Sequence, residues 1–217
     1  MKKNIALFGA TGGLGSQLLT ELKEKYNVIA LGSKDVNVQD NEAVSTFFQE
    51  NEIDIVLNFS GVNYDSFMHK YSNKNLSERD RLIDINIKGT SNIVSNALVK
   101  MREKKYGRII LVSSILAESP VMSTGIYAGC KGFIDSLSKT VAVENASKGI
   151  TCNSIQLGYF DGGLTYNIPE EFRNGIIKTI PMKRLGSIKE LTRLIEMLID
   201  VEYITGTNIK INGGLDF

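Results

Sequence analysis

Three residues in the middle of the chain, Ser114, Tyr127 and Lys131, have the types and spacing of a site for carbonyl reduction. Tyr127 and Lys131 are four residues apart, so on a helix they share one face. An ammonium beside a phenol favours the phenolate, and we therefore expect Lys131 to lower the pKa of Tyr127 from its usual value of about 10. The apolar run at 109–112 predicts a buried strand with the Ser114 hydroxyl at its carboxyl end. A polarising hydroxyl, an acidic phenol and a cation are the groups that this chemistry requires.

Each of these residues also has a purely structural interpretation. A tyrosine and a lysine four residues apart occur by chance in many helices. The pair Ser113-Ser114 after a strand could form only a turn or a helix cap. The functional hypothesis therefore depends on the elements that surround the three residues.

The composition is that of an ordinary folded domain. The chain has 217 residues, of which 42% are hydrophobic and 23% charged, so we expect a single domain spanning residues 1–217. The net charge is +1 with both signs interspersed, which predicts no nucleic-acid partner. The two cysteines form no disulfide framework, which suits a reducing cytoplasm. The apolar run after Met1-Lys2-Lys3 is too short for a signal peptide, and we expect no membrane association.

Short apolar runs alternate with longer segments of helical pattern along the chain. This alternation predicts an α/β fold, a single doubly wound parallel sheet of the Rossmann type with helices on both faces. Residues 162–187 lack clear periodicity, and we expect them to form a lid over a substrate pocket. The predicted strands are Ile5–Phe8, Val28–Leu31, Ile53–Phe59, Ile109–Val112, Thr151–Leu157 and Thr207–Ile211, and the helical segments include Leu14–Lys25, Asn41–Asn51, Arg79–Arg102 and Ala128–Ala146.

A glycine-rich segment, residues 9–15 (GATGGLG), follows the first predicted strand and opens a helix. Glycines at such a turn allow the backbone to approach a pyrophosphate, which the helix N-terminus then stabilises. Glycine clusters also occur in ordinary turns after strands. The position in the first βα unit favours dinucleotide binding.

The end of the second predicted strand bears on the choice of cofactor. An NAD site usually places an acidic residue there to bind the ribose 2′-hydroxyl. Here Ser33 and Lys34 stand in that place and could bind a 2′-phosphate, so NADP(H) is favoured over NAD(H). Asp35 follows directly and opposes this preference. The alternative is that Ser33-Lys34 is simply a polar loop.

Taken together, these motifs resemble the short-chain dehydrogenase/reductase family from end to end. The family's Gly-x-x-x-Gly-x-Gly is matched at 9–15, the Asn-Asn-Ala-Gly after its fourth strand at 58–61, and its Asn-x-x-Gly at 86–89. The serine, tyrosine and lysine have the family's spacing. The segments 149–153 (GITCN), 204–206 (ITG) and 211–214 (INGG) are similar to the 3-oxoacyl-(acyl-carrier-protein) reductase branch.

The resemblance implies reversible hydride transfer between a nicotinamide cofactor and a carbonyl or alcohol. In the reductive direction Ser114 would polarise the carbonyl, Tyr127 would deliver the proton, Lys131 would assist Tyr127 and bind the nicotinamide ribose, and Asn86 would hold a water that connects Lys131 to solvent. No metal is implied. The residues expected to contact the cofactor are Gly9, Thr11, Gly13, Leu14, Gly15, Ser33, Lys34, Asn37, Val38, Phe59, Ser60, Gly61, Tyr127, Lys131, Gly158 and Phe160.

The chain departs from the family pattern mainly in its cofactor half, and the segment after the second strand is short. These departures bear on cofactor affinity and on the subfamily, and they leave the four catalytic positions intact. They are Phe8 for threonine, Gly12 for a basic or polar residue, Asn37 for aspartate, Phe59-Ser60 for Asn-Ala, Leu157 for proline and Gly162 for threonine.

The substrate is not determined by these motifs. A small-molecule ketone and a carrier-bound thioester are both compatible with them, and Lys105 and Lys148 lie where the acyl-carrier branch presents cations. His69, the single histidine, could touch substrate or be a solvated loop residue. By resemblance we expect a homo-oligomer, a dimer or tetramer. The competing hypothesis is a cofactor-binding regulator or scaffold of the same fold with little catalysis.

Overall fold

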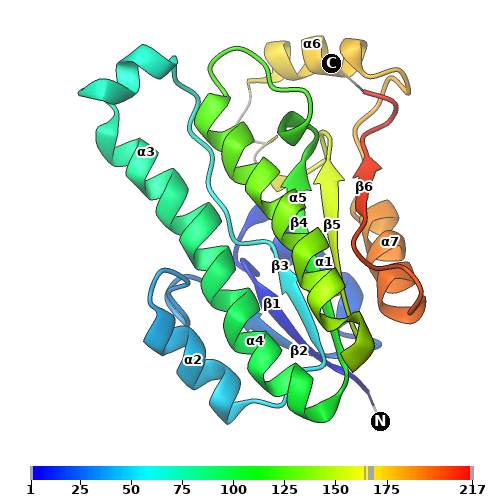
Figure 1. Ribbon diagram of the computed structural model, residues 1–217. Helices are drawn as coiled ribbons and strands as arrows, with labels where there is room; N and C mark the ends of the chain where they lie inside the picture. Colours follow the sequence, from blue (N-terminus) through cyan, green and yellow to red (C-terminus); the bar gives the residue numbers. More distant parts are fainter. Residues whose placement is uncertain (1, 164, 166–168, 216–217) are drawn as a thin grey trace.

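The computed structural model describes residues 2–163, 165 and 169–215, and its centre is a twisted parallel sheet (Figure 1). Six strands of the described chain pair in the order β2-β1-β3-β4-β5-β6, all parallel. The apolar residues of β1, β3, β4 and β5 are almost all buried, as expected for a sheet covered on both faces, whereas those of the edge strands β2 and β6 are mostly at least partly exposed. The strands are β1 (Asn4–Phe8), β2 (Asn27–Leu31), β3 (Ile55–Asn58), β4 (Gly107–Ser114), β5 (Ile150–Leu157) and β6 (Asn208–Ile211).

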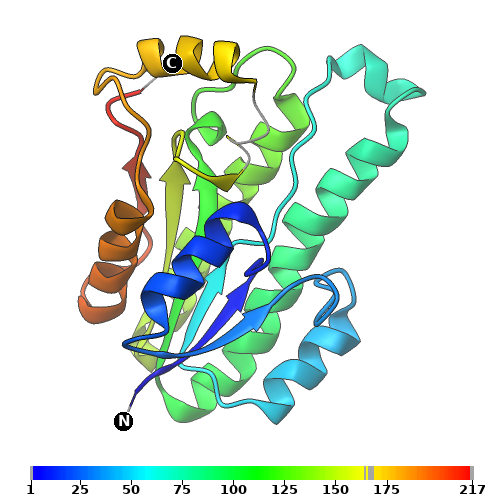
Figure 2. The same ribbon diagram turned by 180° about the vertical axis from the view of Figure 1, so that it is seen from behind.

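Helices cover the two faces of the sheet and form two apolar cores. On one face α2 (Asn41–Glu50), α4 (Thr90–Lys104) and α5 (Gly125–Asn145) pack on β1, β3, β4 and β5. On the other face lie α1 (Gly13–Leu22) and α7 (Ile188–Asp200), seen from behind in Figure 2. The remaining helices are α3 (Leu76–Ile83) and α6 (Glu170–Thr179).

Strand order reverses between β1 and β3, because β2 lies on one side of β1 and the later strands lie on the other. In open α/β sheets, ligands bind outside the carboxyl ends of the strands at such a reversal. Phe8 pairs with Asn58, so the carboxyl ends of β1 and β3 are adjacent, and β4 continues three residues past Leu111, the partner of Asn58, to Ser114. The glycine-rich turn after β1 therefore faces the segment after β3.

The predicted sheet is confirmed. The Asn58 motif follows the third strand, as the predicted strand Ile53–Phe59 implies, because residues 32–54 between β2 and β3 contain only α2. Two details differ from the prediction. The predicted helix Arg79–Arg102 is α3 and α4, joined by a π-helical turn at Asp84–Gly89. The region 162–187 contains α6, whose side chains are all at least partly exposed. In the part of the chain that is described, no helix is long and apolar enough to span a membrane.

Candidate active site

Ser114 is the last residue of β4 and is buried. Its Oγ accepts a hydrogen bond from the Leu116 backbone N–H at 3.2 Å and caps the short 3₁₀ helix Ile115–Ala117. The hydroxyl therefore has the structural role of a cap as well as a place at the carboxyl end of the sheet. Capping holds the oxygen in one orientation, which is useful for a group that must polarise a substrate.

Tyr127 and Lys131 lie on α5 and are brought to Ser114 by the packing of α5 on β4. The Lys131 Nζ donates to the Val112 carbonyl oxygen at 2.8 Å and lies 5.5 Å from the centre of the Tyr127 ring. The Ser114 hydroxyl lies close enough to Tyr127 to lower the pKa of its phenol. Thus three groups that are up to 17 residues apart in sequence form one cluster.

The expected lowering of the Tyr127 pKa by Lys131 is wrong for this structure. Burial raises the pKa of Tyr127 to about 12, and the carboxylate of Asp65 raises it too, while the Ser114 hydroxyl acts in the opposite direction. Burial also lowers the pKa of Lys131 to about 8. Enclosure disfavours both charged forms, so at neutral pH Tyr127 is a protonated phenol.

Asn86 lies in the π-helical turn between α3 and α4. Its Nδ2 donates to the carbonyl oxygens of Val62 at 3.0 Å and Leu82 at 2.9 Å, and its Oδ1 accepts from the Val62 N–H at 3.3 Å. A single π turn frees backbone carbonyls, and such turns occur frequently at functional sites. A Cβ atom placed on Gly61 would lie 2.9 Å from Asn86 Oδ1 and 3.6 Å from Lys131 Nζ, so Gly61 lies beside both side chains.

The turn after β1 has the geometry of a phosphate cradle. Gly9 has a φ of +79°, and its N–H donates to the Leu31 carbonyl at 2.8 Å. A Cβ atom on Gly9 would lie 2.5 Å from the carbonyl carbon of Phe59, and one on Gly15 would lie 2.2 Å from the Gly9 oxygen. Only glycine fits at these positions, and the residues therefore fit a dinucleotide whose phosphates approach the backbone.

The start of the predicted lid lies on this turn. A Cβ atom on Gly13 would lie 2.5 Å from the Gly163 Cα, and one on Gly163 would lie 3.0 Å from the Leu14 side chain. The Gln17 Nε2 donates to the Asp161 carbonyl at 3.4 Å and holds the same contact. Residues 164 and 166–168 of the lid lie outside the described residues.

Two other residues expected near the cofactor follow β5. The Gly158 N–H donates to Ile211, and a Cβ there would collide with Asn212. The Phe160 side chain is buried in the core and packs on Gly186. A contact from Phe160 to a cofactor would therefore come from its backbone and not from its ring.

The end of β2 presents both signs of charge. Ser33 and Lys34 are exposed, as expected of groups that would bind a 2′-phosphate. The Asp35 Oδ2 accepts the Gly32 N–H at 2.8 Å, and the Thr11 hydroxyl lies on the same side of Gly32. The Asp35 carboxylate is thereby held at the strand end, where it counteracts Lys34.

The remaining predicted cofactor contacts lie around these two turns. Asn37 is exposed and its Oδ1 accepts the Gln39 N–H, while Val38 packs on Gly89 in the π turn. Ser60 bonds to Asn58 through both its backbone N–H and its hydroxyl. All of them therefore lie near the carboxyl ends of β1, β2 and β3.

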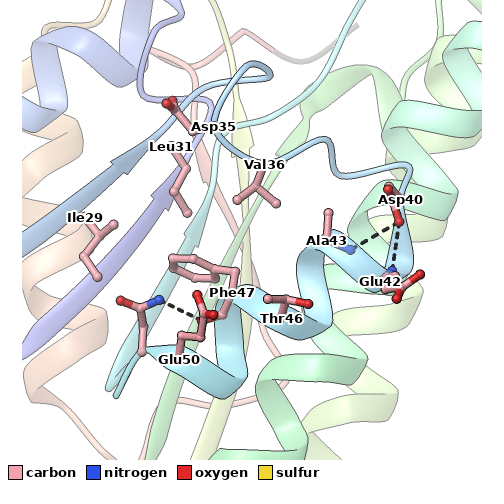
Figure 3. Close-up of a pocket in the computed structure, with 11 residues that line it drawn as sticks. Ile29, Leu31, Asp35, Val36, Asp40, Glu42, Ala43, Thr46, Phe47 and Glu50 are labelled. Carbon is pink, nitrogen blue, oxygen red and sulfur yellow. Dashed lines mark hydrogen bonds between the residues drawn. The ribbon is translucent and has the colours of Figure 1, made fainter.

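A groove of about 600 Å³ lies between β2 and α2, away from the catalytic cluster (Figure 3). The side chains of Ile29, Leu31 and Val36 surround it together with Phe47 of α2, and Asp35 and Glu50 lie at its ends. None of the four predicted catalytic residues lines it. In the described chain β2 is the strand at this edge of the sheet, so no further strand covers its outer side.

Asp65 is the site residue that the sequence did not reveal. Its charge raises the pKa values of both Tyr127 and Tyr159. The Ser66 N–H donates to the Ser123 carbonyl at 2.8 Å and holds this segment against the start of α5. No periodicity or motif marks such a long-range contact. His69 is exposed and stacks on Phe67, with ring centres 5.9 Å apart.

Comparisons with known proteins agree with this geometry. The family described as enoyl-(acyl carrier protein) reductase matches residues 4–216. The 3-oxoacyl-(acyl-carrier-protein) reductase FabG of Haemophilus influenzae is 27% identical over 242 residues, covering 99% of each chain. Nodulation protein G of Azospirillum brasilense is 29% identical over 248 residues, covering 100% of each. The solved structure "ElxO with NADP Bound" has a TM-score of 0.88 and 25% identity, covering 99% of this chain and 98% of that one.

Proposed function

Because the chain belongs to the short-chain dehydrogenase/reductase family, oxidoreductases that act on CH–OH and C=O groups with NAD(P), we propose that it is an NADP(H)-dependent reductase of a 3-oxoacyl thioester. The observation that carries the proposal is the cluster of Ser114, Tyr127 and Lys131 at the carboxyl end of the sheet. A regulator would not need a protonated phenol, a fixed hydroxyl and a cation in contact.

The reductive reaction uses each of these residues for a separate task. The cofactor supplies the hydride when bound. Ser114 donates a hydrogen bond to the carbonyl oxygen, and Tyr127 then transfers its proton to that oxygen as negative charge develops. With its pKa near 12, Tyr127 holds this proton throughout the neutral range. Lys131 stabilises the phenolate left behind, and Asn86 positions the route by which the proton is replaced.

The preference for NADP(H) is supported by Ser33 and Lys34, both exposed at the end of β2. It is also supported by the similar solved structure, "ElxO with NADP Bound". Asp35 is the one charge at this strand end that opposes a 2′-phosphate. We therefore propose NADP(H) with a modest preference over NAD(H).

Substrate and assembly follow from the relatives. FabG relatives are named for 3-oxoacyl groups on acyl-carrier protein, and we propose a carrier-bound or small thioester substrate for this chain. The segment 162–187 would then form the lid, since its first residues already lie on the glycine-rich turn. We further propose a homo-oligomer, a dimer or tetramer, as expected of the family, in the cytoplasm.

The test is loss of reduced-nicotinamide absorbance with NADPH or NADH against a panel of an acetoacetyl thioester, diketones and keto-sugars. Tyr127→Phe should reduce turnover by at least about a hundredfold while cofactor binding, followed by fluorescence, is nearly unchanged. Tyr203→Phe is the matched control, since Tyr203 is fully exposed. Near-normal turnover in Tyr127→Phe would refute the mechanism. Tight binding without turnover of any substrate would favour a nucleotide-binding regulator.

A further inference from the structure

The strand β2 lies at one edge of the sheet and directs part of its backbone to the open side. The Asn27 N–H and the Leu31 carbonyl oxygen form hydrogen bonds of 3.0 Å and 2.8 Å with the backbone just before and just after β1. Because backbone groups alternate in direction along a strand, those of Val28 and Ala30 point away from β1. No strand of the described chain pairs with that side.

This open edge lacks the features that normally prevent a further strand from adding to a sheet. Edge strands in native proteins usually carry a charged residue, a proline or a bulge. The sequence of β2 is NVIAL, and it pairs with β1 residue by residue without a bulge. The opposite edge strand β6 differs, because it carries Lys210, which forms an ion pair with Glu118. The β2 edge is therefore open to strand addition.

The groove between β2 and α2 lies directly beside this edge (Figure 3). Its floor is apolar and includes the side chains of Ile29, Leu31 and Phe47. Side chains alternate between the faces of a sheet, so every second side chain of a strand added to β2 would lie on the same face as Ile29 and Leu31. An added strand would therefore continue the sheet and also place side chains over the groove.

The rim of the groove is acidic. Among the described residues that line the groove, four carry exposed carboxylates and none is a lysine, arginine or histidine. These four residues, which we call the acidic rim, are Asp35, Asp40, Glu42 and Glu50. Asp35 and Asp40 are held in place because each accepts a backbone N–H group. Complementary charge steers association and suppresses wrong partners, so the acidic rim favours a cationic occupant.

A second copy of this chain fits the edge poorly. Two β2 strands paired antiparallel would be related by a two-fold axis perpendicular to the sheet, which places both grooves on the same face. The acidic rims of the two copies would then approach each other, and like charges across an interface are unfavourable. β2 contains no cation that could offset the opposite rim. The charges therefore favour a different occupant.

We propose that the β2 edge and the adjacent groove form a docking site for an extended segment of another protein, in which basic and apolar side chains alternate. The segment adds to the sheet by bonding to the backbone groups of Val28 and Ala30. Its basic side chains lie over the apolar floor with their charged ends at the acidic rim, as long cationic side chains commonly do. Its apolar side chains lie on the other face, beside Val28.

This site is independent of the proposed function. None of the four residues that we assign to the reaction lines the groove, and binding of a segment can be measured without cofactor or substrate. Failure of the docking proposal would therefore leave the reductase proposal intact, and loss of the reductase proposal would leave docking untouched.

The first experiment measures binding of a short fluorescein-labelled peptide in which lysine and valine alternate, by fluorescence anisotropy with the full chain. The peptide should bind at low salt and more weakly at high salt, since exposed charges are screened within about 10 Å at 0.1 M. Glu42→Gln and Glu50→Gln should each weaken binding by up to about fivefold. Glu171→Gln is the matched control, because Glu171 is exposed on α6, at the opposite end of the molecule from α2 (Figures 1 and 2).

The second experiment tests the backbone contacts by hydrogen exchange followed by NMR. The peptide should slow exchange of the Val28 and Ala30 amides, which point to the open side. It should leave Ile29 unchanged, because Ile29 already pairs with Ala6 of β1. A peptide in which proline replaces every valine keeps the charges and cannot form a regular strand. It should bind more weakly and protect neither amide.

Three outcomes would overturn the proposal. The first is absence of binding, or binding that leaves exchange at Val28 and Ala30 unchanged. The second is equal binding of the proline peptide, since charge attraction alone would then be responsible. The third is protection of the two amides that grows with protein concentration in the absence of peptide, which would assign the edge to a second copy of the chain.

Discussion

The Lys131 ammonium is bonded to the Val112 carbonyl oxygen at 2.8 Å, two residues before Ser114 on the same strand. This bond joins α5 to β4 at the level of the reactive hydroxyl. It fixes the position of the Lys131 ammonium along the strand relative to Ser114. Because an ammonium has three N–H donors, Lys131 can still donate to other acceptors. The helix and the strand are therefore aligned by one of the residues that we assign to the reaction.

The pH dependence of reduction should follow Lys131. Because burial lowers the pKa of Lys131 to about 8, the side chain is fully protonated below that pH and loses its charge as the pH rises through it. Tyr127, with a pKa of about 12, stays protonated over the same range. We expect kcat/KM for reduction to be constant near neutral pH and to fall above about pH 8. The Lys131→Arg variant keeps its charge at high pH and should not show this decline. If kcat/KM of the variant still falls above about pH 8, another group is responsible for the titration.

The glycine-rich turn should not tolerate a side chain at Gly9. Gly9→Ala combines a φ of +79° with a Cβ 2.5 Å from the Phe59 backbone, so we expect loss of measurable cofactor binding and a lower melting temperature. Gly129→Ala is the matched control on α5, where a Cβ meets no atom within 4 Å. It should stabilise the protein by about 0.5–1 kcal/mol. Fluorescence titration measures cofactor binding and thermal melts measure stability in both variants. Normal cofactor affinity in Gly9→Ala would contradict the assignment of this turn to cofactor binding.

Cofactor preference should change with Asp35. Asp35→Asn removes the charge that opposes a 2′-phosphate and keeps an oxygen that can accept the Gly32 N–H. We expect the affinity for NADPH relative to NADH to rise by about fivefold, as for an exposed charge interaction of about 1 kcal/mol. Lys34→Gln should change the ratio in the opposite direction. Parallel binding titrations at low salt test this, and equal effects on both cofactors would place the 2′-phosphate elsewhere.

The stability of the N-terminus of α7 should depend on the Ser187 side chain. Its side chain accepts the Glu190 N–H while the Glu190 carboxylate accepts the Ser187 N–H, which is a complete capping box. Ser187→Ala should lower the free energy of unfolding by about 1 kcal/mol. Urea unfolding with an unchanged m-value would show this, and Ser136→Ala, at an exposed site within α5, should have little effect. A loss of the same size in both variants would mean that the cap contributes nothing specific.

Much of the fold followed from local patterns. The apolar runs predicted the positions of the six described strands, because buried parallel strands are continuous and short. Helix α6 was not predicted, and none of its residues is buried in the structure. The π turn at Asn86 was not predictable, because the sequence through 79–102 reads as one helix and the turn depends on contacts with Val62 and Leu82.

The sequence by itself determined the alternation of strands and helices, the shared helix face of Tyr127 and Lys131, and the turn that only glycine permits, because each depends on neighbours a few residues away. The tertiary structure decided the charge states. Burial set the pKa values of Tyr127 and Lys131 against the expectation from their spacing, since desolvation depends on what packs around a group. It also brought the Asp65 charge within reach of Tyr127 and joined Asp135 of α5 to Gln156 of β5, which no local pattern records.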